Sequence, residues 1–327
     1  MRHQSLFYSL FPPPKFLTMP HAGLEISDDA LRCIEYRSTP HGLVVSKFAK
    51  AELPPNLIDG GNISDEKQFI ELLKAFVRVN KLSYVKVSLP EEKVYLFQLD
   101  IPSTEVKAIT QHVEFKLEEN VPLPASEAVF YFDILPASVT GGVLRASVSV
   151  VPKTYVEKML SILHGMKLTP MAFEVAPKSI AKAVIPNSSD NTYLIVHVMN
   201  KKIGTYIVSG GVVCFSSTIA WGGILNIPSD PEQVSLAIDP VMREIQRVYT
   251  YWATRPDAHS KIAEILVVGK GAATLETMFH TNATAGLPPL ATEDIWRNAF
   301  DIHKYIPAIS REDSLEYAVA AGLALPS

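Results

Sequence analysis

The sequence predicts an α/β protein with two lobes and a small α+β insertion in the first lobe. A β-meander, a helix and a strand occur in this order twice, in residues 22–89 and again in residues 193–268. A separate unit at about residues 100–165 is too regular for a loop and too small for the main core. The length of 327 residues and a hydrophobic content of 47% are enough for one large core or two medium ones.

The first repeat begins with three short β-type runs between residues 22 and 49. Turn-forming residues separate these runs, at Asp28-Asp29 and at Pro40-His41-Gly42. After the cap candidate Ser64, apolar residues recur at the spacing of three and four that is typical of a helix: Phe69, Leu72, Leu73, Phe76 and Val77. Residues 84–89 then alternate in polarity and predict a strand.

The inserted unit is predicted in the order helix, strand, strand, helix. The first helix covers residues 106–117, and the two strands cover residues 129–135 and 143–151 with a turn at Gly141-Gly142 between them. The second helix covers residues 154–164. We therefore expect an independent small subdomain here.

The second repeat follows a short strand at residues 168–173 and a helix after Pro177. Its three strands cover residues 193–198, 204–208 and 212–219, and Ser209-Gly210-Gly211 forms the hairpin between the last two. The long helix that follows has an apolar stripe of Val241, Ile245, Val248, Tyr249 and Trp252. A buried strand at residues 262–268 leads to Gly269-Lys270-Gly271-Ala272, and a helix over residues 312–325 comes last.

The composition argues against several classes of function. A net charge of −4 and scattered Lys and Arg residues give no basic surface for nucleic acid. Cys33 and Cys214 lie far apart in apolar strands, which favours a reducing cytosol over a disulfide framework or a metal cluster. No apolar run approaches the roughly 20 residues of a membrane helix. The apolar residues 6–11 end at Pro12 and lack a signal cleavage site, so we expect an arm that docks on its own domain, with a membrane or partner contact as the alternative.

Several segments, each weak alone, occur in the order and spacing of one known family. Residues 23–32 read GLEISDDALR against a typical GIDIGSSSVK, and residues 174–182 read EVAPKSIAK against DVEPxALAR. Residues 220–227, 244–252 and 321–325 correspond to further family segments. The chain thus resembles type IV pilus assembly proteins of the PilM type, in the actin-like (ribonuclease H-like) superfamily that also contains FtsA. The resemblance covers nearly the whole chain from about residue 20.

This resemblance implies a division of the chain. Residues 1–20 would be the N-terminal arm, residues 21–99 subdomain 1A of the first lobe, and residues 100–166 the inserted subdomain 1C. Residues 167–327 would form the second lobe with subdomains 2A and 2B.

The resemblance also implies a nucleotide site between two hairpin turns, and this chain departs from the pattern in both. In the first turn Glu25 replaces the usual Asp, Ser27 replaces a Gly, and Asp28 with Asp29 replaces phosphate-binding Ser residues. These extra carboxylates would repel a triphosphate.

The second turn lacks its Asp and reads HVMNKKI over residues 197–203. Asn200 can adopt a left-handed turn conformation, and Lys201 with Lys202 could form a weak anion site. The interpretation that we favour is that His197 is a satisfied strand residue and the lysines are a solvated turn.

Two further features complete the expected site. The family's pre-proline Glu, which orients the attacking water, falls on Ala176, and Glu174 lies one step further along the strand. The turn that would contact the adenine base of the nucleotide is best preserved. Its residues are Gly269, Gly271 and Ala272. The sequence therefore predicts an eroded site without efficient ATP hydrolysis, at which ATP and Mg²⁺ bind weakly if at all.

The resemblance further implies a partner. PilM-like proteins capture the N-terminal peptide of the membrane protein PilN between subdomains 1A and 1C, at the cytoplasmic face of the inner membrane. The apolar residues that map there are Leu96, Phe97, Val113, Leu117, Phe130 and Phe132. The alternative for each is ordinary domain core. Other platform or motor proteins of the pilus are expected partners.

Two other functions stay open at this point. A working ATPase or nucleotide-dependent switch would use Glu25 and Asp28 with Mg²⁺. An FtsA-like filament former usually carries a C-terminal amphipathic helix, and the sequence ends at Pro326-Ser327 without one.

Overall fold

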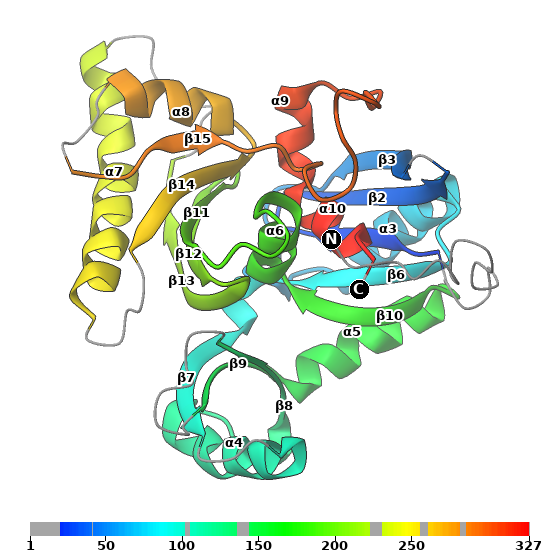
Figure 1. Cartoon of the computed structure of the whole chain (residues 1–327). Helices are drawn as coiled ribbons and strands as arrows, with labels where there is room; N and C mark the ends of the chain where they lie inside the picture. Colours follow the sequence, from blue (N-terminus) through cyan, green and yellow to red (C-terminus); the bar gives the residue numbers. More distant parts are fainter. Residues whose placement is uncertain are drawn as a thin grey trace.

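The computed structural model describes residues 20–40, 42–101, 105–135, 144–222, 231–255, 261–281 and 286–326. The expected arm, except for Pro20, and the expected turn at Gly141-Gly142 lie outside these ranges. The described chain forms two five-stranded sheets and a third, smaller sheet (Figure 1).

The first sheet has the order β10-β6-β1-β2-β3. The antiparallel meander of β1, β2 and β3 pairs through β1 with the parallel strands β6 and β10. Its strands are β1 (Ala22–Ile26), β2 (Ala30–Thr39), β3 (Gly42–Glu52), β6 (Tyr84–Leu89) and β10 (Thr169–Val175). Two short strands, β4 (Ile58–Asp59) and β5 (Asn62–Ile63), pair beside it.

The second sheet repeats this topology in the order β13-β12-β11-β14-β15. A meander of three strands is again followed by two parallel strands. Its strands are β11 (Thr192–Val198), β12 (Lys202–Ser209), β13 (Val212–Ala220), β14 (Ile262–Gly269) and β15 (Leu290–Thr292). The predicted duplication is confirmed, and Gly210 and Gly211 have the positive φ that the predicted hairpin requires.

The inserted subdomain is a three-stranded sheet of order β7-β9-β8 that packs on one helix. Its elements are β7 (Tyr95–Ile101), α4 (Val106–Asn120), η2 (Ala125–Glu127), β8 (Ala128–Ile134) and β9 (Leu144–Pro152). The order is therefore strand, helix, strand, strand. The prediction omitted the first strand, which pairs along its whole length with β9.

Two elements belong to the first lobe, although the sequence placed one in the insertion and the other in the second lobe. Helix α5 (Lys153–Gly165), placed in the insertion, contributes Met159, Ile162 and Leu163 to the core of the first lobe. Strand β10, placed in the second lobe, pairs with β6 in the first sheet. The insertion thus spans residues 95–152, because only these residues form the small sheet and its helix.

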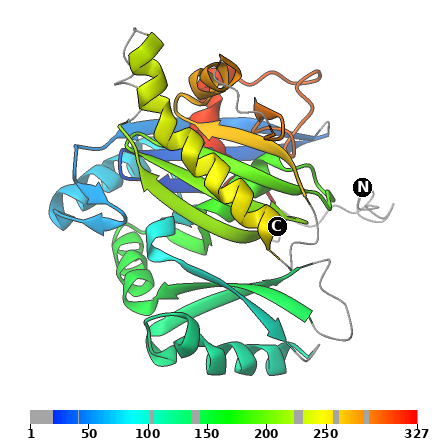
Figure 2. The same cartoon turned by 90° about the vertical axis from the view of Figure 1, so that its left-hand side faces the viewer.

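Two helices cover the outer face of each large sheet. On the first sheet these are α3 (Glu66–Asn80) and α5, and on the second sheet α7 (Pro231–Thr254) and α8 (Ala272–Thr281); Figure 2 shows α7 running diagonally across the strands. The N-cap of α3 is Asp65, which accepts from the Gln68 amide, whereas Ser64 donates to the carbonyl of Asn56. The cap is therefore one residue later than predicted.

Between the two sheets lie α6 (Ala176–Val184) and α10 (Ala318–Ala324), as Figure 1 shows. The predicted terminal helix begins at α9 (Arg311–Ser314) and is interrupted by the 3₁₀ turn η4 (Leu315–Tyr317). Helix α10 has the sequence AVAAGLA and is completely buried. A Cβ on Gly23 of β1 would collide with the Ala320 carbonyl, and one on Gly322 with the Ser179 carbonyl. Small residues thus let three backbones pack directly against each other.

The insertion also contacts the second lobe. Ser147 donates to the Val213 carbonyl at 2.6 Å, and Gln98 donates to the Cys214 carbonyl at 3.2 Å. The Asp133 carboxylate pairs with Lys178 of α6 at 2.7 Å. The small sheet is therefore anchored to both lobes.

No helix among the described residues is both long enough and apolar enough to cross a membrane.

We predict that Gly322→Ala lowers the free energy of unfolding by about 2 kcal/mol or more, because its Cβ would meet backbone that cannot move independently. Denaturant unfolding measures this change. Gly165→Ala is the matched control, since no atom lies within 4 Å of the added Cβ. Equal stability of the two variants would show that α10 is not packed as described.

Candidate functional site

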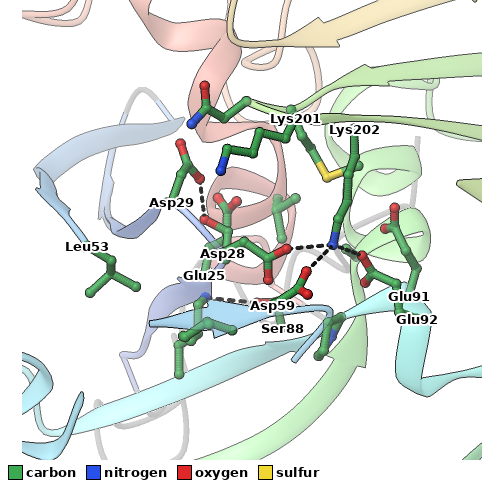
Figure 3. Close-up of a pocket in the computed structure, with 18 of the residues that line it drawn as sticks. Glu25, Asp28, Asp29, Leu53, Asp59, Ser88, Glu91, Glu92, Lys201 and Lys202 are labelled. Carbon is green, nitrogen blue, oxygen red and sulfur yellow. Dashed lines mark hydrogen bonds and ion pairs between the residues drawn. The ribbon is translucent and has the colours of Figure 1, made fainter. Parts of the chain in front are cut away.

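A cavity of about 280 Å³ lies where the two hairpin turns face each other. The turn between β1 and β2 forms one wall, and the turn between β11 and β12 forms the opposite wall. Leu53 to Asp59 and the 3₁₀ turn η1 (Glu91–Lys93) complete it (Figure 3). Among the described residues, the carboxylates of the lining belong to Glu25, Asp28, Asp29, Glu52, Asp59, Glu91 and Glu92, and its lysines are Lys201 and Lys202.

The first turn is organised by a buried arginine. Glu25 and Arg32 are directly opposite in the β1–β2 hairpin, and their side chains pair at 3.3 Å. The same guanidinium contacts Asp29 at 3.0 Å and Glu316 of η4 at 3.4 Å. The Ser27 hydroxyl accepts from Arg32 and donates to Asp29 at 2.7 Å. The polar groups of this turn are thus largely engaged with one another.

Glu25 has one free oxygen in this arrangement. Its side chain is buried, and Oε2 has no hydrogen-bond partner. Burial raises the pKa of Glu25 to about 7, although the neighbouring Arg32 charge acts in the opposite direction. For Asp29 burial is outweighed by Arg32, so the pKa of Asp29 falls below its ordinary value.

The second turn sends a lysine across the cleft into the first lobe. Lys202 Nζ lies 2.6 Å from Asp28 Oδ2, 2.7 Å from Glu92 Oε1 and 3.6 Å from Asp59 Oδ1. Figure 3 shows its side chain reaching from its strand into this carboxylate group. Burial opposes its charge, but the hydrogen bonds to Asp28 and Glu92 outweigh burial and raise the pKa of Lys202. The prediction of a solvated turn is therefore wrong for this lysine.

Glu91 makes a second connection between the lobes. It follows β6 of the first lobe and accepts hydrogen bonds from Tyr206 at 2.7 Å and Thr218 at 2.9 Å, both in the second sheet. Burial between the lobes raises the pKa of Glu91 to about 7. His197 lies beside Tyr206, with its Nδ1 3.4 Å from the hydroxyl, and burial lowers the pKa of His197 to about 4. It is a buried strand residue, as predicted.

The residues expected to bind nucleotide do not all reach the cavity. Glu25, Ser27, Asp28, Asn200, Lys201 and Lys202 line it. Gly269 lines a neighbouring pocket of only about 20 Å³ on the expected base side, and Gly271 and Ala272 line neither. Asn200 does not use the left-handed conformation that was open to it, and the turn is closed by the Met199 amide donating to the Lys202 carbonyl.

The glycine turn on the base side has a structural explanation. Gly269 pairs with Val198 at the end of β11, and a Cβ there would collide with the Val198 carbonyl. Its φ of 99° also favours glycine. Close strand packing thus accounts for this residue without a ligand.

Glu174, the carboxylate near Ala176 in the sequence, does not reach the cavity. Ala176 is in the cavity wall at the start of α6. Glu174 is outside the lining, and its carboxylate contacts Ser179 at 2.8 Å and Lys182 at 3.3 Å.

The apolar residues predicted to bind a peptide are mainly part of the core. Val113 and Leu117 are fully buried in the insertion, so the expectation that they contact a partner is corrected. Leu96 is half-buried against the main core, and the others pack half-buried against the insertion core, namely Phe97, Phe130 and Phe132. On the opposite face of β8, Val129 and Tyr131 are 44% and 58% exposed.

Sequence reasoning missed Arg32, Glu316, Glu91 and Glu92. A turn at residues 27–30 sets the hairpin register that places Arg32 opposite Glu25, so this pair was accessible from the sequence. Glu91 and Glu92 come shortly after β6, as the segment from Lys270 comes after β14, and the repeat places the ends of these two equivalent strands near the cleft. No sequence pattern pointed to Glu316, since only the packing of α10 brings it close to the Arg32 guanidinium.

Among the described residues, no group of three or more His, Cys, Asp or Glu side chains is arranged to hold a metal ion. The two carboxylates expected to serve Mg²⁺ are each paired with a cation of the chain itself, Glu25 with Arg32 and Asp28 with Lys202.

The chain is similar to solved structures of two-lobed proteins. It aligns with a chain of the "PilM-PilN type IV pilus biogenesis complex" at a TM-score of 0.76 and 20% identity, covering 94% of this chain and 98% of that one. The ethanolamine utilization protein EutJ from Carboxydothermus hydrogenoformans aligns at a TM-score of 0.51 and 11% identity, covering 97% and 91%. No protein-family model and no curated protein matches the sequence.

The duplicated sheets and facing hairpin turns define a protein with the actin-like fold, as the sequence predicted. Within that fold, the predicted resemblance to PilM is confirmed at the level of structure, because the alignment includes nearly all of both chains and thus the insertion.

We predict that Glu25→Gln changes how stability depends on pH. The folded state binds this proton more tightly than the unfolded chain, so the wild type loses stability as the pH rises from about 4.5 to about 7, by about 3 kcal/mol at most. The variant lacks this loss, and the difference between the two proteins should grow over this range in denaturant unfolding. Glu71→Gln, at an exposed position of α3, should follow the wild type. Parallel curves for wild type and Glu25→Gln would contradict the burial of this carboxyl group.

We also predict that Lys202→Met lowers the free energy of unfolding by about 2 kcal/mol, because Asp28 and Glu92 are left facing each other without a cation. Lys201→Met, in the exposed neighbouring position, should change it by less than about 0.5 kcal/mol. Thermal and denaturant unfolding distinguish the two variants, and an unchanged Lys202→Met protein would mean that the lysine does not join the lobes.

Proposed function

We propose that this protein is a PilM-like cytoplasmic scaffold of the type IV pilus assembly platform, peripheral to the inner membrane. It binds the N-terminal peptide of a PilN-like membrane protein and contacts other platform or motor proteins. The observation that carries the proposal is the alignment over 94% of this chain and 98% of a chain from the PilM–PilN complex.

The proposal includes a cleft that is held together by the chain instead of by Mg²⁺ and nucleotide. Lys202 of the second lobe acts as the bridging cation, because it reaches across the cleft to Asp28 and Glu92 of the first lobe. Glu91 adds two hydrogen bonds between the lobes through Tyr206 and Thr218. These contacts supply the inter-lobe attraction that a metal and phosphates provide in an actin-like ATPase.

The residues of the cleft do not fit a Mg²⁺-bound triphosphate. Seven carboxylates against two lysines line the cavity, so an added polyanion would be repelled. Ser27 has a side chain where backbone would approach phosphate, and Ala176 cannot orient water. The small pocket beside Gly269 leaves no room for a base. We therefore propose a pseudo-ATPase and derive no hydrolytic step.

The proposed peptide site lies along β8 of the insertion. Among the described strands β8 is at the edge of its sheet, so its outer backbone groups are available for an added strand. Tyr131 of β8 has a large exposed ring, and the Lys178 amine makes a cation–π contact with it at 4.1 Å from the ring centroid. This surface replaces the buried Val113 and Leu117 of the sequence-based prediction.

We predict that a synthetic peptide with the cytoplasmic N-terminal sequence of the PilN-like protein from the same genome binds the full chain in calorimetry. Tyr131→Ala should weaken its binding about tenfold, since exposed aromatic rings are common anchors of interfaces. Phe115→Ala is the matched control, because its ring is 74% exposed on α4. Absence of binding by the wild type would contradict the scaffold function, and equal loss in both variants would contradict the proposed location.

A further inference from the structure

The lining of the cleft cavity includes a carboxyl group with an unused oxygen. Glu25 Oε2 is buried without a hydrogen-bond partner, and Glu25 lines the cavity. An unpaired carboxylate oxygen in a buried position is costly, because its interactions with water are lost and not replaced. A ligand with an N–H donor and a positive charge would satisfy it.

The charge around the cavity favours a cation over an anion. Lys202 is already shared among three carboxylates, and the buried Arg32 is shared among three as well. Lys50 pairs with Glu52 and Glu316. Even with these three cations and Lys201, which also lines the cavity, the carboxyl groups outnumber the cations among the described residues. The excess negative charge attracts cations of low molecular weight.

Part of the remaining wall is apolar. The side chains that form it are Ile26, Leu53, Ile58, Leu89, Met199 and Val319. A hydrated metal ion gains nothing from such a surface, whereas the methylene chain of an organic amine is stabilised by it.

Further negative groups lie at the entrance. Glu52 and Asp59 line the cavity, and their side chains are 63% and 85% exposed. The cavity therefore has the Glu25 carboxyl group in its lining, a partly apolar wall and carboxylates at its mouth.

We propose that this cavity binds a short aliphatic diamine. One ammonium group donates to Glu25 Oε2, the methylene chain contacts the apolar wall, and the second ammonium group meets Glu52 and Asp59. The volume of about 280 Å³ suits such a ligand, because it is at the lower end of the range of about 300–1,000 Å³ for small-molecule pockets.

The inference rests on the proposed function in one respect, namely that the cleft does not bind Mg²⁺ with nucleotide. The two proposals are tested separately by titrating the full chain with putrescine and, in parallel, with ATP and Mg²⁺. Heat on adding putrescine, with no heat on adding ATP and Mg²⁺, supports both the diamine site and the pseudo-ATPase. Heat from neither ligand overturns the diamine site and leaves the pseudo-ATPase in place, whereas micromolar binding of ATP overturns the pseudo-ATPase.

Chemical controls define the recognition. Butylamine has one ammonium group and should bind about tenfold more weakly than putrescine, and butanediol, which has none, should give no heat. Equal binding of butanediol would mean that charge is not recognised and would overturn the proposal.

Variants locate the site. Glu25→Gln should weaken putrescine binding about tenfold or more, and Asp59→Asn, at an exposed position, about threefold. Glu71→Gln on α3 should bind as the wild type does. If Glu25→Gln does not fold, Asp59→Asn together with the butylamine comparison still decides the outcome. Unchanged affinity in both cleft variants would place any diamine elsewhere and overturn the assignment.

Discussion

The close packing of α10 between the two sheets is the constraint on which the rest of the structure depends. Backbone of β1 approaches α10 at Gly23, and backbone of α6 approaches it at Gly322, so neither position has room for a Cβ. This packing sets the separation of the lobes. It also positions Val319 in the cavity wall and brings Glu316 to the Arg32 guanidinium. The geometry of the cleft therefore follows from small residues in a buried helix.

The charges of the cleft are paired within the chain. Arg32 and Lys202 contact the carboxylates of the first turn, Arg32 at Glu25 and Asp29 and Lys202 at Asp28. Because Lys202 belongs to the second lobe, its ion pair with Asp28 also joins the two lobes. The arrangement is incomplete at Glu25, whose second oxygen is unpaired and whose pKa is raised to about 7 by burial.

The insertion is connected to this cleft through α6. It is anchored to the second sheet through Ser147 and Gln98, and to α6 through the pair of Asp133 and Lys178. Helix α6 in turn begins at Ala176 in the cavity wall and packs against α10. The insertion is thus connected through α6 to the cavity wall, and through Ser147 and Gln98 to the second sheet.

Sequence alone determined the duplicated α/β architecture, because alternation, helical spacing and turn residues are local signals that occur in the same order twice. It also located the first hairpin turn, with Glu25 and Ser27, and Ala176 at the start of α6, all of which line the cavity. Tertiary structure decided that β10 and α5 belong to the first lobe, since strand pairing and helix packing join residues far apart in sequence. It also decided the role of Lys202, because an ion pair across 174 positions of sequence exists only once the lobes have met.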